Sequence, residues 1–287
     1  NYALKDVNLE IKKEEFIAVI GHTGSGKSTL IQHLNGLIKP TSGTIYFDDE
    51  DIYSEGYPLR ELRGKVGICF QYPEHQLFET TILDDVCFGP MNFGKTKEEA
   101  TEIAVKCLKD VGLPEKLYQK SPFELSGGQK RRVAIAGILA MEPEYFILDE
   151  PTAGLDPNER IRFRNLISEL SEDRLVLLST HIVSDIEYIA NEIWLMKDGE
   201  ILHKGSIDEL INSMTEAVWE CLVPKNKVSD FMEKYKISNM KSEINQVMLR
   251  IISHKKPVGN AVRVEASLED VFLYYFGEKA GDENATL

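Results

Sequence analysis

Residues 16–29 read FIAVIGHTGSGKST, and this stretch decides the fold. It opens with a continuous apolar run at 16–20, which is typical of a strand covered on both faces. A glycine-rich loop follows, and residues 29–37 then have helical spacing. A strand, a loop and a helix in this order indicate the first unit of an α/β fold.

The loop after this strand fits the phosphate-loop pattern G-x-x-x-x-G-K-[ST], with the flanking strand and helix that the pattern requires. Its glycines allow backbone N–H groups to converge on phosphate oxygens, and Lys27 adds a positive charge near the terminal phosphates. The Ser28 hydroxyl can ligate Mg²⁺. This context favours a nucleotide site over a plain glycine-rich turn. The residues expected to bind the nucleotide are Gly21, His22, Thr23, Gly24, Ser25, Gly26, Lys27, Ser28 and Thr29.

Two adjacent acids, Asp149 and Glu150, directly follow the apolar run at 145–148. In an open α/β fold, ligands bind at the carboxyl ends of the strands. Two carboxylates at a buried strand end are costly without a cation or a proton. We therefore expect Asp149 to take a Mg²⁺-linked role and Glu150 to polarise the attacking water. A surface acid pair before a proline turn is the alternative.

A second loop of small residues, LSGGQ at 125–129, introduces a helix with apolar residues as far as 139. Such a loop at a helix N-terminus is a second anion site in the same chain. One nucleotide does not need two such loops from one chain, so the two loops are expected to serve different subunits. A P-loop kinase or a small GTPase is disfavoured, because neither class needs the second loop.

Residues 2–212 closely resemble the ATPases of the ATP-binding-cassette (ABC) family, whose signature is LSGGQ. Six motifs occur in the order typical of that family. They are the Walker A at 21–29, the Q-loop at Gln71, the signature at 125–129, the Walker B at 145–150, the D-loop at 153–156 and the switch histidine His181.

The resemblance implies a head-to-tail dimer that sandwiches ATP between the Walker motifs of one subunit and the signature of the other. Glu150 would be the catalytic base, His181 would contact the γ-phosphate, and Gln71 would sense Mg²⁺ and water while touching a membrane partner. A structural role is the alternative for a lone histidine, but His181 follows a strand where this fold opens to ligand. The resemblance further implies nucleotide contacts from Ser126, Gly127, Gly128, Gln129 and Asp156, and metal ligands at Ser28, Gln71 and Asp149.

One departure from the family concerns adenine. The family has a first strand and an adenine-stacking aromatic upstream of the position of Ala3, and this region is reduced here to Tyr2. Tyr2 is therefore the candidate for stacking on the base, and a weakened nucleotide affinity is expected.

The organisation along the chain indicates a P-loop NTPase of the ABC type with a largely parallel sheet. Residues 73–140 are predicted to form a helical insert, in which Thr96 and Glu99 make a capping box. A small α+β appendage is predicted from residue 213. The expected domains are 1–212 and 213–277, followed by a mobile polar tail at 278–287. Further predicted strands are 44–47, 66–70, 145–148, 175–179, 193–196, 217–223 and 246–252, and further predicted helices are 227–235 and one that starts near Ser267.

The last of these helices has one apolar face. This face is expected either to contact a copy or a paralogue of the chain, or to be buried within the appendage. Its residues are Leu268, Val271, Phe272, Tyr275 and Phe276.

The composition excludes some classes of function. The formal charge of −14 argues against a general nucleic-acid binder, since phosphate backbones need an excess of Lys and Arg. No apolar run is long enough to cross a bilayer, and the four cysteines lack metal-site spacing, so buried reduced thiols are expected. Together with the resemblance, this predicts a peripheral protein at the cytoplasmic face of the cell membrane. Its partners would be integral membrane transporter subunits and a second ATPase, either a copy or a paralogue.

Residues 71–90 resemble the ATPases of energy-coupling-factor importers, which take up vitamins and transition-metal ions such as cobalt or nickel. The segment lies where a membrane subunit docks. Leu77 and Phe78 are expected to be exposed and to form a groove for a partner helix, unless they fold back onto the insert.

From about residue 158 the chain resembles the ATPases of drug and antibiotic exporters, notably at 179–186 and 267–272. An exporter subunit is therefore the second expected function, and a hybrid of two parents would pack poorly at 157/158. The docking segment has more weight, because it is the surface that touches the partner. A soluble ABC ATPase acting on ribosomes or DNA is a third alternative, although such proteins usually carry two cassettes or a coiled-coil insert.

Overall fold

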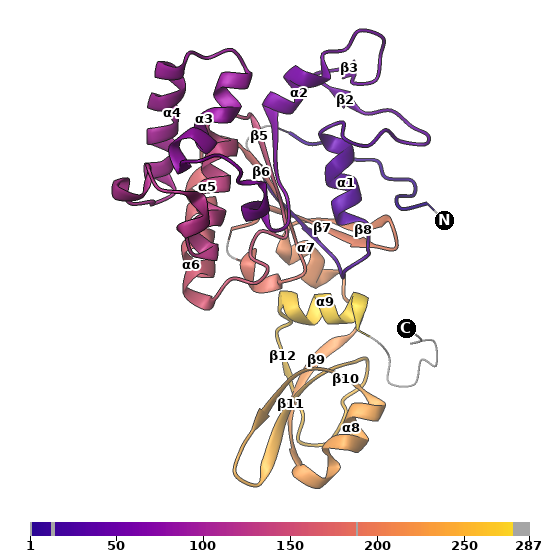
Figure 1. The fold of residues 1–287 in the computed structure, drawn as a ribbon. Coiled ribbons are helices and arrows are strands. Elements are labelled where there is room, and N and C mark those ends of the chain that lie inside the picture. The colour runs from indigo at the N-terminus through magenta and orange to yellow at the C-terminus, as the bar shows by residue number, and fades with distance from the viewer. Residues whose placement is uncertain (1, 13–14, 188, 278–287) are drawn as a thin grey trace.

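The computed structural model describes residues 2–12, 15–187 and 189–277. These residues form a large body built on a six-stranded main sheet and a small body built on a four-stranded second sheet (Figure 1). The two bodies follow one another along the chain, and the last helix returns to lie between them (Figure 1). The tail at 278–287, which the sequence predicts to be mobile, lies outside the described residues.

The main sheet has the strand order β4-β5-β6-β1-β7-β8. The first five of these strands are parallel, and β8 closes the edge antiparallel to β7. The apolar runs correctly predicted all five parallel strands, whereas β8 alternates between half-buried and exposed residues and has no such run. The bounds are β1 Phe16–Ile20, β4 Val66–Cys69, β5 Tyr145–Asp149, β6 Leu175–Thr180, β7 Glu192–Lys197 and β8 Glu200–Gly205.

Two apolar cores lie on the two faces of the main sheet. Because side chains alternate along a strand, Phe16 and Ile20 of β1 lie in one core and Ile17 and Val19 lie in the other. Helices α3 to α6 cover the first face, and α1, α2 and the β2–β3 hairpin cover the second (Figure 1). The bounds are α1 Lys27–Leu34, β2 Tyr46–Phe47, β3 Glu50–Asp51, α2 Leu59–Lys65, α3 Ile82–Asn92, α4 Lys97–Asp110, α5 Gly127–Leu139 and α6 Pro157–Leu170.

Helices α3, α4 and α5 lie between β4 and β5 in the chain, where the sequence predicts a helical insert. The predicted capping box starts α4: the Glu99 N–H donates to Thr96 Oγ1 at 3.2 Å, and the Thr96 N–H donates to Glu99 Oε2 at 2.8 Å. The helix predicted at 29–37 begins earlier, at Lys27, because the left-handed Gly26 before it serves as the N-cap.

The second sheet has the order β10-β11-β9-β12 and is antiparallel throughout. Cys221, Leu249 and Ile251 are at the centre of its apolar core, and Phe231 of α8 packs against them. The sequence predicted β9 and β11 but not β10 and β12, which are largely exposed edge strands. The bounds are α7 Ile207–Asn212, β9 Ala217–Pro224, α8 Val228–Lys234, β10 Lys236–Ser242, β11 Gln246–Ser253, β12 Val262–Val264 and α9 Leu268–Phe276.

Helix α9 joins the two bodies through its apolar face. Leu268 and Val271 are buried in the core of the large body, and Phe272, Tyr275 and Phe276 pack against that core. Lys197 Nζ, at the end of β7, donates to the Tyr275 carbonyl at 3.1 Å. The large body therefore covers this face. The sequence led us to expect either burial within the appendage or an exposed face that contacts a copy or a paralogue, and the structure shows neither.

A buried ion pair lies at the start of α9. Asp270 is 0% exposed and accepts hydrogen bonds from the Arg250 guanidinium at 2.7, 3.1 and 3.2 Å. The Ser267 N–H and hydroxyl donate to the same carboxylate at 2.8 and 2.9 Å. Burial raises the pKa of Asp270, but the hydrogen bonds from Arg250, Ser238 and Ser267 outweigh it, so the pKa lies below its ordinary value. This carboxylate is fully compensated as an anion.

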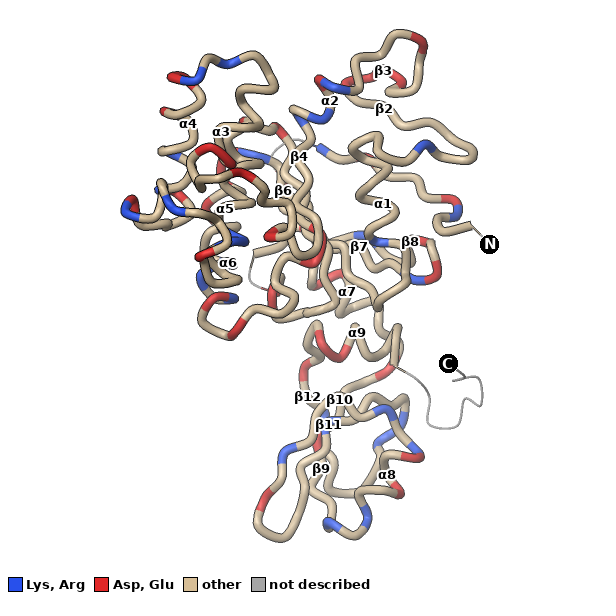
Figure 2. The backbone as a smooth tube through the Cα atoms, in the orientation of Figure 1, with Lys and Arg blue, Asp and Glu red and all other residues tan. Residues whose placement is uncertain are grey.

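The cysteines, the helix lengths and the charged residues bear on what the composition led us to expect. All four cysteines are free and buried, as expected. Burial raises the pKa of the Cys69 thiol to about 12 and that of Cys107 to about 11. Within the described ranges, no helix is long and apolar enough to cross a membrane. Figure 2 shows acidic and basic residues interspersed along both bodies.

Candidate functional site

The carboxyl ends of four neighbouring parallel strands meet at one edge of the main sheet. There β1 leads into the phosphate loop at 21–26, and β4 leads to Gln71. The next strand, β5, ends at Asp149 with Glu150 directly after it, and β6 is followed by His181. Since β4, β5, β6 and β1 are adjacent, residues far apart in the sequence come together at this edge.

The phosphate loop combines left-handed glycines with one buried cation. Gly24 has a φ of +84° and Gly26 a φ of +106°, a region that glycine adopts without steric cost. Lys27 is buried, and its Nζ donates to the carbonyls of Gly21 and His22 at 2.8 and 3.1 Å. These bonds hold the ammonium group within the curve of the loop.

Two features of this loop fit a phosphate ligand. The Ser25 hydroxyl is buried and has no hydrogen-bond partner among the described residues, so the loop contains an unpaired donor. The loop also has no room for a side chain at two of its three glycines. A Cβ on Gly21 would collide with the Met196 carbonyl, and one on Gly26 would lie 2.9 Å from the Ala3 carbonyl.

Glu150 is the centre of the polar cluster at the sheet edge. Its Oε1 lies 3.3 Å from Lys27 Nζ, and its Oε2 lies 3.3 Å from both Gln71 Nε2 and His181 Nδ1. The backbone at Glu150 has a φ of +45°, and its N–H donates to the Ser179 carbonyl at 3.0 Å and the Ser179 hydroxyl at 3.2 Å. A side-chain-bearing residue in this region is uncommon and is typical of active sites. The structure thus brings all three predicted catalytic residues together with Lys27.

Asp149 is buried beside this cluster and accepts a hydrogen bond from the Ser179 hydroxyl at 2.5 Å. A neutral hydroxyl does not balance a buried carboxylate charge, so a cation fits here. Ser28 is exposed on the first turn of α1, and Gln71 supplies an amide oxygen. These hard oxygen ligands suit Mg²⁺, which binds one or two protein carboxylates together with substrate phosphates. Consistently, no group of three or more His, Cys, Asp or Glu among the described residues could hold a metal alone.

The signature loop at 125–129 forms the N-terminus of α5. The Gln129 N–H donates to Ser126 Oγ at 3.3 Å, and the Ser126 N–H donates to Gln129 Oε1 at 3.0 Å, which completes a capping box. Gly127 is exposed. Over the described part of the chain, no hydrogen bond or ion pair joins this loop to the phosphate loop. The predicted nucleotide ligands at 126–129 are therefore not part of the cluster around Glu150.

Asp156 and Tyr2 are also outside that cluster. The Asp156 carboxylate caps α6, because its Oδ1 accepts from the Asn158 and Glu159 N–H groups at 2.9 and 3.0 Å. Tyr2 is 68% exposed, and it adjoins Ala3 near the phosphate loop. Stacking of Tyr2 on adenine stays a prediction.

A family model described as "ABC transporter" matches residues 4–153, which include the phosphate loop, Gln71, the signature loop and both acids of the Walker B. The chain belongs to the ABC transporter family of ATPases. It is accordingly an ATP-binding and ATP-hydrolysing transporter subunit, and its six-stranded P-loop fold is that of the family.

Several curated ABC proteins are similar to this chain. The energy-coupling factor transporter ATP-binding protein EcfA2 of Lactococcus lactis is 51% identical over 215 residues, which cover 74% of this chain and 75% of the relative. EcfA2 of Bacillus subtilis is 53% identical over 212 residues, covering 72% of this chain and 77% of the relative.

Solved structures of ABC ATPases are also similar to this chain. The structure of cbiO1 from Clostridium perfringens, part of the ABC transporter complex cbiONQ, has a TM-score of 0.67 and 39% identity, covering 74% of this chain and 84% of its own. A dimeric ATP-binding cassette in a post-hydrolysis state with ADP and phosphate has a TM-score of 0.64 and 35% identity, covering 71% of this chain and 90% of its own.

The junction at 157/158, where the sequence raised the hypothesis of a hybrid, lies inside these matches. A match that covers 74% of the chain must include position 157/158, whether it lies toward the start or toward the end of the chain. Helix α6 begins at Pro157, and its Phe163, Leu166 and Ile167 are buried in the core of the large body. The structure describes residues 15–187, and the junction within this range does not have the poor packing expected for a hybrid.

The docking segment departs from expectation at one of its two apolar residues. Phe78 is 57% exposed, as predicted, and its ring meets that of exposed Phe88 edge-on at 4.8 Å. Leu77 is buried in the core of the insert, so the prediction that it is exposed is wrong. The buried Asp85 carboxylate accepts from the Phe78 and Glu79 N–H groups at 3.1 and 3.0 Å, which folds the segment onto α3.

Two contacts near the site were not predicted from the sequence. Arg131 is buried on α5 and contacts Glu74 of the docking segment. The ring of Phe276 in α9 meets the His22 ring of the phosphate loop edge-on at 5.6 Å. The sequence places a cation, Arg131, on the apolar face of the helix after the signature, and this position could have indicated a buried role. No local sequence pattern could have predicted the contact between Phe276 and His22, because these residues are far apart in the chain.

Proposed function

We propose that the chain is the ATPase subunit of an energy-coupling factor importer for vitamins or for transition-metal ions such as cobalt or nickel. The observation that carries the proposal is the 51% identity to EcfA2 of Lactococcus lactis over 74% of the chain. The similarity to cbiO1, part of the cbiONQ transporter complex, supports the same class of importer. The exposed aromatic residues of the docking segment supply a surface for the membrane partner.

In this proposal Glu150 is the general base that polarises the attacking water. Lys27 stabilises negative charge on the terminal phosphates, and His181 contacts the γ-phosphate. Gln71 orients the water and connects it to the docking segment, which begins at this residue. The convergence of Lys27, Gln71 and His181 on one carboxylate, each at 3.3 Å, supports these roles.

Ser28, Asp149 and Gln71 are the residues proposed to hold Mg²⁺. The bound ion would neutralise phosphate charge and orient the phosphate chain. The buried charge of Asp149, balanced only by a neutral hydroxyl, supports this assignment. Ser179 keeps the Asp149 carboxylate in place through its hydroxyl.

We propose that a second ATPase subunit, a copy or a paralogue, completes each site. The signature residues Ser126, Gly127, Gly128 and Gln129 of one subunit would then close on the phosphate loop of the other. The separation of these two loops within one chain supports this arrangement. So does the similarity to a cassette whose structure is dimeric. Asp156 and Tyr2 are proposed to lie at the edge of the closed site, Tyr2 beside the base.

The proposed arrangement divides the chain at 212/213, with a nucleotide-binding domain at 1–212 and an accessory subdomain at 213–277. The docking segment at 71–90 is proposed to receive a helix of an integral membrane subunit. Phe78 and Phe88 form an exposed aromatic pair there, which suits an apolar helix face. This docking would hold the chain at the cytoplasmic face of the cell membrane.

An exporter subunit is the alternative function, and it rests on the sequence after residue 158. The matches to EcfA2 proteins extend past that position, and the junction is well packed. Both observations favour the importer over a hybrid with an exporter half.

The test is complementation of a Lactococcus lactis strain that lacks its EcfA2. The chain is expected to enter the membrane fraction and to restore uptake of a labelled vitamin, whereas Phe78→Asp leaves it in the soluble fraction. Val262→Asp, at an exposed position of the second sheet, is the control for adding a charge to an exposed apolar side chain. A chain that is expressed and hydrolyses ATP, yet reaches no membrane and restores no uptake, contradicts the proposal.

A further inference from the structure

Arg131 is a buried cation that does not touch the phosphate loop. It lies on the first turns of α5, directly after the signature, and is 3% exposed. Its NH1 donates to the Pro151 carbonyl at 2.7 Å and to the Ala153 carbonyl at 2.9 Å. These two carbonyls belong to the turn that immediately follows Glu150, so the guanidinium fixes the backbone on which the proposed base stands.

The other edge of the same guanidinium faces the docking segment. Nε donates to Glu74 Oε2 and NH2 donates to Glu74 Oε1, both at 3.3 Å. Glu74 lies in the 3₁₀ turn Pro73–Gln76, three residues after Gln71 and four before the exposed Phe78. A two-pronged carboxylate–guanidinium pair transmits orientation as well as charge, because both groups are planar.

The Glu150 turn is a sensitive point to hold in this way. Glu150 has a left-handed backbone, and the Ala153 N–H donates to the Glu150 carbonyl at 3.2 Å. A conformation of this kind persists only when its surroundings enforce it. Arg131 supplies two of the hydrogen bonds that do so, and their direction depends on where Glu74 holds the guanidinium.

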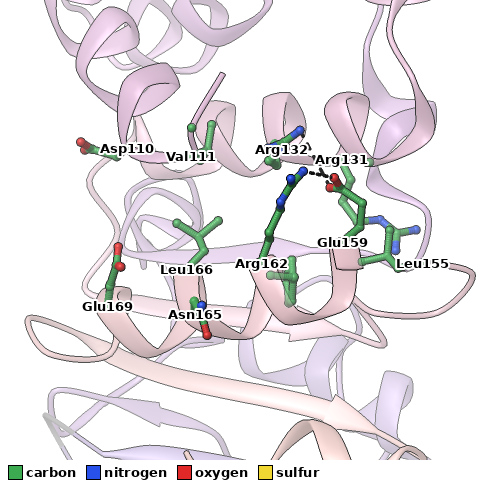
Figure 3. A pocket seen from close by; sticks show the side chains of 13 residues that line it. Asp110, Val111, Arg131, Arg132, Leu155, Glu159, Arg162, Asn165, Leu166 and Glu169 are labelled. Atoms are coloured by element: carbon green, nitrogen blue, oxygen red, sulfur yellow. Dashed lines mark hydrogen bonds and ion pairs between the residues drawn. The ribbon is translucent and has the colours of Figure 1, made fainter. Parts of the chain in front are cut away.

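Figure 3 shows Arg131 beside the contacts between α5 and α6. Arg132, the next residue on α5, pairs with Glu159 of α6 at 3.9 Å, and Arg162 pairs with the same carboxylate at 2.8 Å. The Arg132–Glu159 pair joins α5 to α6, and the Arg162–Glu159 pair lies within α6. Arg131 and Leu155 are among the residues that line a cavity of about 270 Å³ beside these helices.

We propose that Arg131 is a positioning residue that couples the docking segment to the catalytic turn. Glu74 fixes the position of the guanidinium. The guanidinium in turn fixes the positions of the Pro151 and Ala153 carbonyls, and thereby that of Glu150. Docking of an apolar partner helix on the Phe78 surface shifts this linkage and changes the rate of hydrolysis. The inference rests on the proposed function for its partner, but the link from Glu74 to Glu150 lies within this chain.

The first experiment measures the purified full chain with Mg-ATP and with a fluorescent ATP analogue. Arg131→Met is expected to lower kcat about tenfold or more, because small displacements of a catalytic group are costly, while the affinity for the analogue stays the same. Arg131→Lys keeps the charge but not the two-pronged geometry, so it should recover only part of kcat. The matched control is Lys109→Met, which removes an exposed cation from the insert.

A stability role alone would give a different pattern. In that case Arg131→Met would lower the melting temperature, and kcat measured well below that temperature would stay within twofold of the wild type. That result overturns the proposal, as does a parallel loss of kcat and of analogue affinity. If Arg131→Met fails to fold, Glu74→Gln provides the same kcat test, because it weakens the pair that positions the guanidinium and does not remove the guanidinium itself.

A double-mutant cycle tests the direction of the coupling. The effects of Glu74→Gln and Arg131→Met on kcat should be non-additive, since the carboxylate acts through the guanidinium. Additive effects overturn the proposal.

The partner arm uses the complex with the transmembrane subunit of the Lactococcus lactis energy-coupling factor transporter. The wild-type chain should change its hydrolysis rate on assembly, and Glu74→Gln should lose most of that change. An assembled complex in which Glu74→Gln responds like the wild type overturns the coupling. If no complex forms although Arg131→Met shows the kcat effect, the proposed importer function fails and the internal link stands.

Discussion

Glu150 and Asp270 are both largely buried carboxylates that face a cation, yet they are held in opposite ways. Asp270 is 0% exposed and takes hydrogen bonds of 2.7 to 3.2 Å from one guanidinium and two from a single serine. Glu150 is 13% exposed, and its three partners come from three separate elements, all at 3.3 Å. The first acid has a closed set of short bonds, and the second has an open set of long ones.

The difference separates stability from activity. A carboxylate such as Asp270, held by short bonds from a guanidinium and a serine, stabilises the fold as an anion and has no capacity left for a ligand. Glu150 instead meets a lysine, an amide and an imidazole that can each turn to a phosphate, an ion or a water. A strained backbone at Glu150, absent at Asp270, fits the same division.

The largest effect is expected at Glu150. Glu150→Gln removes the proposed base but keeps the shape, so kcat should fall by about 10²- to 10⁴-fold. Because its bonds are long and few, the melting temperature should change little. Size exclusion with Mg-ATP should show a dimer for this variant, in which bound ATP is not consumed. Hydrolysis at the wild-type rate contradicts the role of Glu150.

The next effect is expected at the ion pair between Arg250 of β11 and Asp270 of α9. Arg250→Met leaves Asp270 as an unpaired buried charge and should lower the free energy of unfolding by about 3–5 kcal/mol. The chain has two tryptophans, and Trp219 lies in β9, so its fluorescence in a Trp194→Phe background reports on the second sheet. Lys256→Met, at an exposed position, is the control. A variant as stable as this control would show that the pair only offsets its own desolvation.

A smaller effect is expected from pH. The pKa of Asp270 in the folded chain lies below its ordinary value of about 3.9. A depressed pKa contributes stability that is present above the unfolded value and is lost as the pH falls through the folded value. The Trp219 signal should therefore show a loss of stability only below about pH 4, and Arg250→Met should weaken this dependence. A loss that begins near neutral pH contradicts the assignment to Asp270.

The smallest effect is expected at the thiols. Burial raises the pKa of Cys69 to about 12 and also raises that of Cys221 in the second sheet. Both should resist iodoacetamide at pH 8 in the native chain and react in urea, since the thiolate is the reactive form. Mass spectrometry of peptides gives the extent at each site. Rapid modification of Cys221 in the native chain would mean that the small body opens more readily than the large one.

Most of the large body could be predicted from the sequence, because its signals are local. The apolar runs gave the five parallel strands, and the loops after them gave the positions of Lys27, Glu150 and His181. The capping box at Thr96 likewise needs only four residues to be recognised. Local patterns sufficed here because a buried parallel strand must be apolar throughout.

The parts that were missed depend on partners distant in sequence. Edge strands β8, β10 and β12 have mixed polarity, since water covers one of their faces. Leu77 and Phe78 are adjacent and equally apolar, and only the packing of α3 decides that Leu77 is buried and Phe78 exposed. The contact of Arg131 with Glu74 spans 57 residues, and no periodicity predicts it.

The position of β1 has a consequence for how the protein is made. The neighbours of this strand in the sheet are β6 and β7, which follow it in the chain by more than 150 residues. At ordinary rates of synthesis the apolar strand waits for roughly ten to thirty seconds before either neighbour exists. During that time the strand is an exposed, aggregation-prone edge. We therefore expect the nascent chain to need protection of this strand until β6 has been made and can pair with it.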